Sequence, residues 1–199
     1  MPVRPIKDNA APGLGEFLEV PLTLLAGRPF HARITVLVIV LNCSLYDLHA
    51  DEVQVCELPL RQFGKPLSSF GPCATLVTLE DHRPVLRALE QPGNGRMLVV
   101  DAGGSMRVGV LGERLAEIAM RNGWRGVVIN GVIRDSRGID VLEIGVHALG
   151  TTARRSNEPT EGRVGVPLCF GGVTFAPGDW VYADADCVIT APRELPLPD

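Results

Sequence analysis

The sequence predicts a mixed α/β fold in a single compact domain. The first observation is a pair of short apolar runs, residues 97–100 and 126–130, which flank an amphipathic helical pattern and so form a βαβ unit. The second is the stretch after residue 165, where β-type runs alternate with Gly-Gly and Pro-Gly-Asp turns, the pattern of antiparallel hairpins. The third is the length of 199 residues, which suits one domain with a full hydrophobic core.

Residues 1–41 are predicted to form an N-terminal extension that is poorly ordered or packs on the surface of the domain, which comprises residues 42–199. The extension contains five prolines and ends in the apolar run 34–41. That run is far too short to cross a bilayer. The start of the chain also lacks a cationic head that leads into an apolar core, so we expect neither a signal peptide nor a membrane span.

Helix and strand patterns follow in order up to the central unit. Residues 44–53 predict a short helix. Residues 73–78 are rich in β-branched side chains and predict a strand that enters from a turn at Gly71-Pro72. The helix that comes next is expected to begin with Asp81 as its cap.

The helix inside the βαβ unit is expected to begin near Gly112 and not at Ser105. Glycines at positions 109 and 112 inside a helix would each cost ~1 kcal/mol relative to alanine, whereas the apolar spacing fits a helix from Gly112 onward. The first turn, residues 112–115, would then present free backbone N–H groups and the positive end of the helix dipole to an anion such as a carboxylate. In the alternative interpretation, Glu113 only complements the dipole.

Shorter signals follow the central unit. Residues 139–144 are expected to form one or two helical turns, and residues 146–149 another strand. Residues 150–165 are polar and predict a surface loop. Its arginines, among them Arg154 and Arg155, could help to hold a second carboxylate, but the composition favours a solvated loop.

The composition argues against several classes of function. A net charge of −4 disfavours a nucleic-acid groove, which needs a basic face. Five cysteines without a C-x-x-C pair predict buried free thiols and hence a cytoplasmic protein. The four histidines share no motif, so any metal should be a hard ion held by oxygen ligands and not zinc.

The central unit closes on an Arg-Asp pair, Arg134-Asp135. Because the carboxyl ends of parallel strands share one edge of a sheet, this pair and the loop after Asp101 should meet in one crevice, where open α/β sheets bind ligands. Arg134 could grip a carboxylate or a ketone oxygen, Asp135 offers a hard oxygen ligand, and Glu113 could reach the same metal directly or through water. The alternative is a structural Arg–Asp ion pair.

Two other mechanisms are disfavoured. The chain's two lysines are Lys7, near the N-terminus, and Lys65, in a Gly-Lys-Pro turn, so neither is placed to form a Schiff base in a pocket. The nucleotide-binding motifs G-x-G-x-x-G and G-x-x-x-x-G-K are absent. A carbonyl enzyme built from this chain should therefore use a metal.

Four stretches, in this order, resemble the family of regulator of ribonuclease activity A and the class II 4-hydroxy-4-methyl-2-oxoglutarate aldolases. The resemblance covers about residues 44–190. The stretches are DEVQVCELPLRQFG (51–64), DAGGSMRVGVLGERLAEIAMRNGWRGVVINGVIRD (101–135), IGVHALGT (144–151) and FGGVTFAPGDWVYAD (170–184).

The resemblance implies a domain of the swivelling β/β/α type, assembled as a homotrimer or hexamer. It also implies cleavage of 4-hydroxy-4-methyl-2-oxoglutarate, or a related 4-hydroxy-2-oxo acid, to pyruvate, together with oxaloacetate decarboxylase activity. The catalytic pair would be Arg134, which contacts substrate, and Asp135, which binds Mg²⁺ or Mn²⁺. The family's substrate-binding G-x-x-L turn corresponds here to Gly112, Glu113, Arg114 and Leu115, with Glu113 as a water-mediated partner of the metal.

Some members of the same family bind and inhibit a ribonuclease of the RNA degradosome, and these can lack the metal-binding Asp. The presence of Asp135 favours the enzyme without excluding a ribonuclease partner, and no direct contact with nucleic acid is expected. A methyltransferase label that relatives have carried finds no Gly-rich cofactor loop here. Cys187 and His82 depart from the family pattern, and both are expected to lie away from the site.

Overall fold

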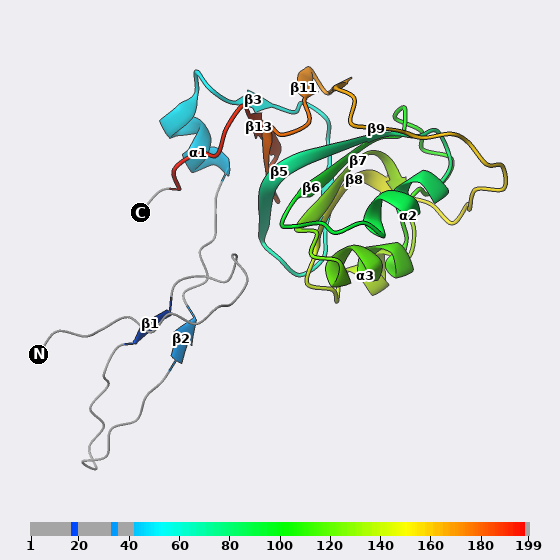
Figure 1. Cartoon of the computed structure of the whole chain (residues 1–199), viewed down its shortest axis with the longest axis horizontal. Helices are drawn as coiled ribbons and strands as arrows, with labels where there is room; N and C mark the ends of the chain where they lie inside the picture. The colour runs from blue at the N-terminus through cyan, green and yellow to red at the C-terminus, as the bar shows by residue number, and fades with distance from the viewer. Residues whose placement is uncertain (1–16, 20–32, 36–41, 198–199) are drawn as a thin grey trace, which may run out of the picture. The chain divides into compact units, whose positions relative to one another are not determined.

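The computed structural model describes residues 17–19, 33–35 and 42–197 (Figure 1). The chain divides into two units, residues 1–39 and 40–199. In the first unit, β1 (Phe17–Glu19) pairs antiparallel with β2 (Arg33–Thr35). Most of the predicted extension lies outside the described residues, so its character stays a prediction.

The second unit is built on one large sheet. Within the described part of the chain its strands run in the order β3-β13-β12-β5-β6-β7-β8-β4, with β9 also paired to β5. The strands β5, β6, β7 and β8 are parallel, and β12 and β4 flank them antiparallel. The bounds are β3 (Gln54–Val55), β4 (Arg61–Phe63), β5 (Ser68–Val77), β6 (Met97–Asp101), β7 (Gly126–Ile133), β8 (Gly145–Thr151), β9 (Arg163–Val164), β12 (Trp180–Asp184) and β13 (Val188–Ala191).

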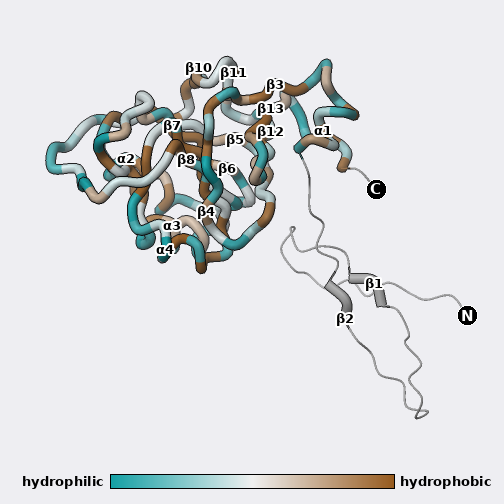
Figure 2. The backbone as a smooth tube through the Cα atoms, turned by 180° about the vertical axis from the view of Figure 1, so that it is seen from behind, coloured by the Kyte–Doolittle hydropathy of each residue, from teal (hydrophilic) through white to brown (hydrophobic). Residues whose placement is uncertain are grey.

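Both faces of the central strands are covered. Leu98 and Ile129 point into the core beneath α2 (Arg83–Leu89) and α3 (Glu113–Arg121), which lie side by side on one face (Figure 1). Val99 and Val128 point into the other core, formed with the hairpin of β10 (Leu168–Phe170) and β11 (Val173–Phe175). A parallel strand buried on both faces is apolar at nearly every position, and Figure 2 shows this as the brown interior of the sheet.

The α/β class, the βαβ unit and the C-terminal hairpins are as predicted. In the unit, β6 and β7 pair in parallel from Met97 opposite Gly126 to Asp101 opposite Asn130, and α3 connects them. The helix ends at Arg121 with Asn122 as its C-cap, and Gly123 takes the left-handed conformation with φ of 77° that helix ends favour. The first helix, α1 (Asn42–His49), begins slightly earlier than expected.

Four details of the prediction were wrong. The turn expected at Gly71-Pro72 belongs to β5, because Pro72 lies in the half of that strand that pairs with β12 and needs no N–H toward β6. Helical turns expected at 139–144 occur instead as α4 (Ser136–Ile139), because β7 continues to Ile133 and the chain turns at once. Asp81 stands one residue before the cap position, which His82 occupies. Of the five thiols, Cys43 and Cys169 are exposed and not buried.

Among the described residues, no helix is long and apolar enough to cross a membrane.

Stability should depend on pH through His147, a residue of β8 that is 1% exposed. Burial lowers the pKa of His147 from 6.5 to about 4, although its Nε2 lies 3.0 Å from the carbonyl oxygen of Asp184. The unfolded chain therefore binds a proton at this position between these two pH values, whereas the folded protein does not. The free energy of unfolding should fall as pH is lowered through this window, by roughly 3 kcal/mol at most.

Urea unfolding of the wild type and of His147→Gln between pH 7 and pH 4 measures this effect. The variant should show a flatter pH dependence, and His49→Gln, which changes a partly exposed histidine, should keep the wild-type slope. An equally steep slope in His147→Gln would assign the pH dependence to other groups.

Candidate active site

The loop after β6 is held by Asp101. Its Oδ1 accepts hydrogen bonds from the backbone N–H of Gly103 at 2.9 Å and from the side-chain amide of Asn130 at 2.9 Å. Farther along the loop, Ser105 donates from its hydroxyl to Glu80 at 2.6 Å, and Arg107 pairs with the same carboxylate. These contacts connect the loop to β7 and to the turn after β5, so Asp101 has a structural role at the strand end.

The segment before α3 runs along the end of β7. The N–H of Val110 donates to the carbonyl of Val132 at 3.1 Å, and the N–H of Arg134 donates to the carbonyl of Leu111 at 2.8 Å. Gly112 follows in extended conformation as the cap of α3, which begins next to the position expected from the sequence. The two strand ends therefore bring the start of the helix against the Arg-Asp pair.

Glycines make the close approach possible. A Cβ at Gly109 would collide with the Cγ of Arg134, and a Cβ at Gly112 would lie 2.7 Å from Oδ2 of Asp135. At Gly138, in α4, a Cβ would collide with the carboxylate of Glu113. The side chain of Glu113 therefore turns toward α4, while Arg134 and Asp135 lie across the segment that leads into α3.

Arg134 and Asp135 do not form the structural ion pair that was the alternative interpretation. Among the described residues, the exposed Asp135 carboxylate has no hydrogen-bond or ion-pair partner, and the buried Nε of Arg134 has no hydrogen-bond partner. Asp135 also has φ of 56° and ψ of 38°, a left-handed conformation that non-glycine residues adopt infrequently. Unpartnered charges on a strained backbone are typical of ligand sites.

The start of α3 offers donors to the same space. The carbonyl of Gly112 accepts the N–H groups of Leu115 and Ala116. The N–H groups of Glu113 and Arg114 have no acceptor within the part of the chain that the structure describes. Free N–H groups at the positive end of a helix favour a bound anion.

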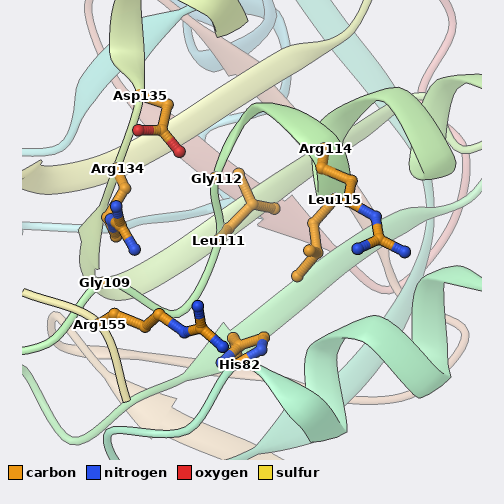
Figure 3. Close-up of a pocket in the computed structure, with 9 residues that line it drawn as sticks. All are labelled: His82, Gly109, Leu111, Gly112, Arg114, Leu115, Arg134, Asp135 and Arg155. Carbon is orange, nitrogen blue, oxygen red and sulfur yellow. The ribbon is translucent and has the colours of Figure 1, made fainter. Parts of the chain in front are cut away.

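Gly112, Arg114, Arg134 and Asp135 line one pocket of about 240 Å³ (Figure 3). A second, more open cavity of about 520 Å³ lies on the side of Arg134 and Asp135 that faces α4 and the end of β8. The first pocket is lined by His82, Gly109, Leu111, Gly112, Arg114, Leu115, Arg134, Asp135 and Arg155.

The pocket contains most but not all of the residues that the sequence indicated. Glu113 lines neither cavity, because its side chain packs against Gly138. His82 was expected to lie away from the site but lines the pocket. Arg155, one of the loop arginines considered for a second carboxylate, is exposed as predicted and also lines the pocket. No sequence motif marked His82, which precedes α2 and lies outside the central unit.

The charge of the pocket is predominantly positive. Arg114, Arg134 and Arg155 outnumber the one carboxylate, Asp135. Burial lowers the pKa of His82, an effect that the negative charge of Asp81 opposes and the nearby arginines increase. A small ligand with more than one negative charge suits this arrangement.

The donor set also fits a hard divalent cation. Within the described residues no group of three or more His, Cys, Asp or Glu side chains gathers around one point. Mg²⁺ nevertheless requires only one or two carboxylates, since it retains several waters. The unpartnered carboxylate of Asp135 could serve as the direct ligand, with the exposed carboxylate of Glu113 beside α4 as an outer partner.

The fold and the pocket define an α/β protein with a predominantly positive pocket that contains one unpartnered carboxylate. A family model described as RraA-like, Aldolase/RraA, matches residues 43–190. The chain therefore belongs to the RraA-like family.

Curated relatives are similar over almost their whole length. A protein of Laribacter hongkongensis named "Putative 4-hydroxy-4-methyl-2-oxoglutarate aldolase" is 43% identical, over 78% of this chain and 98% of its own. A protein of Alkalilimnicola ehrlichii with the same name is 42% identical, over 76% of this chain and 94% of its own.

Two solved structures share the fold. The RNA-processing inhibitor RraA of Thermus thermophilus has a TM-score of 0.75 and 34% identity, over 80% of this chain and 96% of its own. A Geobacillus kaustophilus protein titled S-adenosylmethionine:2-dimethylmenaquinone methyltransferase has a TM-score of 0.74 and 46% identity, over 78% of this chain and 96% of its own.

Replacing Gly109 with alanine should weaken anion binding. The added Cβ would push the side chain of Arg134 out of its place, so the affinity for oxalate, a small dianion, should fall about tenfold or more. Isothermal titration calorimetry measures the change. In the control Gly150→Ala, the nearest side-chain contact would be the end of Met106 at 3.4 Å, and oxalate affinity should stay at the wild-type value. Unchanged affinity in Gly109→Ala would contradict the placement of the anion.

Proposed function

We propose that the protein is a divalent-metal-dependent class II aldolase. It would cleave 4-hydroxy-4-methyl-2-oxoglutarate, or a related 4-hydroxy-2-oxo acid, to pyruvate, and would also decarboxylate oxaloacetate. The observation that carries this proposal is the meeting of the unpartnered Arg134 and Asp135 side chains with the start of α3 in one pocket. The names of the curated relatives support the same substrate class.

The backbone at the start of α3 would bind the carboxylate of the 2-oxo acid. The free N–H groups of Glu113 and Arg114 supply donors without any side-chain rearrangement. The glycine cap, Gly112, lets the substrate come close to the backbone, and Leu115 provides an apolar wall. These contacts would orient the ketone oxygen toward Arg134.

Mg²⁺ or Mn²⁺ would be held by Asp135 directly and by Glu113 through water. When bound, the ion supplies Lewis-acid polarisation of the 2-oxo group. The planar guanidinium of Arg134 stabilises the negative charge on the same oxygen while the C–C bond breaks. In the aldol cleavage the 4-hydroxyl loses its proton as C4 becomes the carbonyl carbon of the second product. The electrons of the C3–C4 bond pass to the pyruvate fragment, which takes up one proton at C3, so that the overall reaction consumes no proton.

One site can serve both reactions, because decarboxylation of oxaloacetate also leaves the bond electrons on a pyruvate fragment. An imine mechanism finds no support in the described residues. Lys65 is exposed and pairs with Glu143 at 3.0 Å, and it does not line the pocket. The other lysine, Lys7, lies outside the described residues.

A second candidate function is inhibition of a ribonuclease through protein–protein contact. The similarity to the Thermus thermophilus RNA-processing inhibitor favours it, and the shared fold accommodates either role. The Asp135 carboxylate and its pocket favour the enzyme. We also propose a homotrimer or hexamer in the cytoplasm, on the resemblance to the family.

Pyruvate release should depend on both the metal and Asp135. Wild-type protein with Mg²⁺ should release pyruvate from 4-hydroxy-4-methyl-2-oxoglutarate and from oxaloacetate, and EDTA should abolish turnover. Asp135→Asn should lower kcat/KM by roughly 100-fold or more, because it removes the charged metal ligand but keeps a side chain that tolerates left-handed backbone. A lactate dehydrogenase-coupled assay reports pyruvate.

The matched control is Asp140→Asn, which removes the same charge just after α4 and should keep wild-type kcat/KM. Absence of turnover by folded, Mg²⁺-loaded wild type with both substrates would reject the aldolase. Inhibition of a degradosome ribonuclease by that same sample would then favour the second candidate.

Replacing Arg134 with lysine should impair the chemical step although the charge is retained. A compact ammonium cannot supply the planar, two-point contact of guanidinium, so kcat should fall at least about tenfold. Steady-state kinetics with oxaloacetate measure the change, and Arg137→Lys, at an exposed position in α4, should behave as wild type. Full activity in Arg134→Lys would show that a positive charge alone suffices at this position.

A further inference from the structure

Arg155 and the imidazole of His82 form a second group of hydrogen-bond donors in the pocket, which the proposed chemistry does not use. Figure 3 shows the imidazole of His82 and the guanidinium of Arg155 next to one another, on the far side of the pocket from Asp135. The positive charge of Arg155 also acts on the titration of His82, which agrees with this closeness. Among the described residues, Arg155 has no ion-pair or side-chain hydrogen-bond partner of its own.

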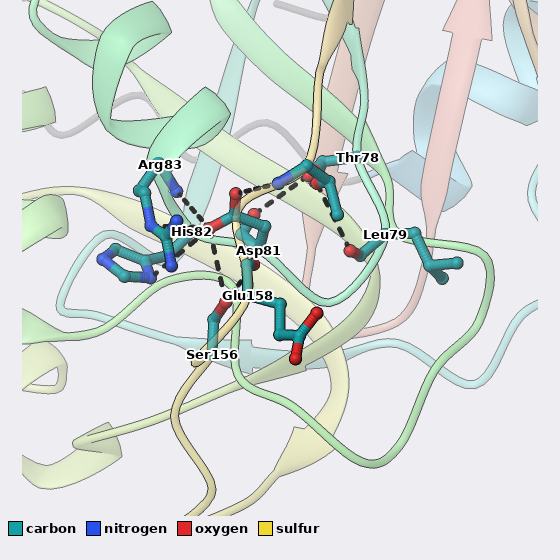
Figure 4. A network of polar contacts seen from close by, with 8 residues as sticks. Thr78, Leu79, Asp81, His82, Arg83, Ser156 and Glu158 are labelled. Atoms are coloured by element: carbon teal, nitrogen blue, oxygen red, sulfur yellow. Dashed lines mark hydrogen bonds and ion pairs between the residues drawn. The ribbon is translucent and has the colours of Figure 1, made fainter.

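One buried carboxylate connects the two chain segments that carry these residues. Asp81 is 0% exposed and accepts hydrogen bonds from the N–H of Thr160 at 2.7 Å and from the hydroxyl of Ser156 at 3.4 Å (Figure 4). It also accepts the N–H of Arg83 at 3.1 Å, at the start of α2. Asp81 therefore joins the residues that flank His82 to the loop that carries Arg155.

The backbone of Arg155 is fixed from the other side as well. It forms a parallel bridge with Gly109, whose N–H donates to the carbonyl of Arg154 at 3.1 Å. Gly109 is the residue over which the side chain of Arg134 lies. The backbone that carries Arg155 thus has a defined position relative to Arg134.

We propose that His82 and Arg155 bind the second carboxylate of the substrate and make the enzyme selective for dicarboxylic 2-oxo acids. The proposal rests on the function proposed above, in which the first carboxylate binds at the start of α3. The guanidinium of Arg155 offers a charge-assisted hydrogen bond to a carboxylate, and the imidazole of His82 offers a second donor at the same end of the pocket. A monocarboxylic acid would leave this end of the pocket unpaired.

A pair of ligands of equal chain length tests the selectivity. 2-Oxoglutarate and 2-oxopentanoate differ only in a carboxylate that replaces the terminal methyl group. By isothermal titration calorimetry in the presence of Mg²⁺, the wild type should bind 2-oxoglutarate about tenfold or more tightly than 2-oxopentanoate. Arg155→Gln and His82→Ala should each reduce that preference to about threefold or less, with the affinity for 2-oxopentanoate unchanged.

Arg154→Gln is the matched control, because Arg154 is exposed on the same loop and does not line the pocket. It should keep the wild-type preference. A preference that persists in Arg155→Gln and in His82→Ala, or an equal loss of affinity for both ligands, would overturn the subsite while leaving the aldolase intact. Failure of the wild type to bind either acid, together with absence of pyruvate release, would overturn the proposed function and the subsite with it.

Discussion

Two backbone hydrogen bonds, from Val110 to Val132 and from Arg134 to Leu111, tie the segment before α3 to the end of β7. The parallel pairing of β6 with β7 makes this contact possible, since both strands deliver the chain to the same edge of the sheet. The start of the helix and the Arg-Asp pair consequently lie together before any ligand binds. The pocket depends on these backbone hydrogen bonds, because the side chains of Arg134 and Asp135 have no partner among the described residues that would otherwise fix them.

The contact between the segment before α3 and the end of β7 also explains several locally unfavourable features of the sequence. Gly109 and Gly112 lack the Cβ atoms that would strike Arg134 and crowd Asp135, although glycine near a helix start is entropically unfavourable. Asp135 has left-handed backbone, and its carboxylate forms no hydrogen bond or ion pair with described residues that would offset the strain. Such costs persist where a ligand makes use of them. In the proposed aldolase, these features serve to bind the substrate carboxylate and the metal.

The sequence predicted the centre of the site better than its rim. Apolar runs, helix periodicity and the rule for parallel strands sufficed to bring residues 112–115 near Arg134 and Asp135. They could not predict the direction of Glu113, which depends on the space that Gly138 leaves in α4. His82 was missed, and Arg155 was named only as one of several loop arginines, because Asp81 links their segments through hydrogen bonds to residues 75 and 79 positions away. No local pattern encodes contacts of that range.

A crystal structure of the protein with Mn²⁺ and oxalate tests the proposed site most directly. Anomalous scattering locates the ion without reference to activity, and oxalate stands in for the planar 2-oxo acid. The predicted result is Mn²⁺ on the carboxylate of Asp135, with oxalate between Arg134 and the N–H groups of Glu113 and Arg114. Mn²⁺ at another position, or oxalate bound away from the start of α3, would contradict the assignment of this pocket as the active site.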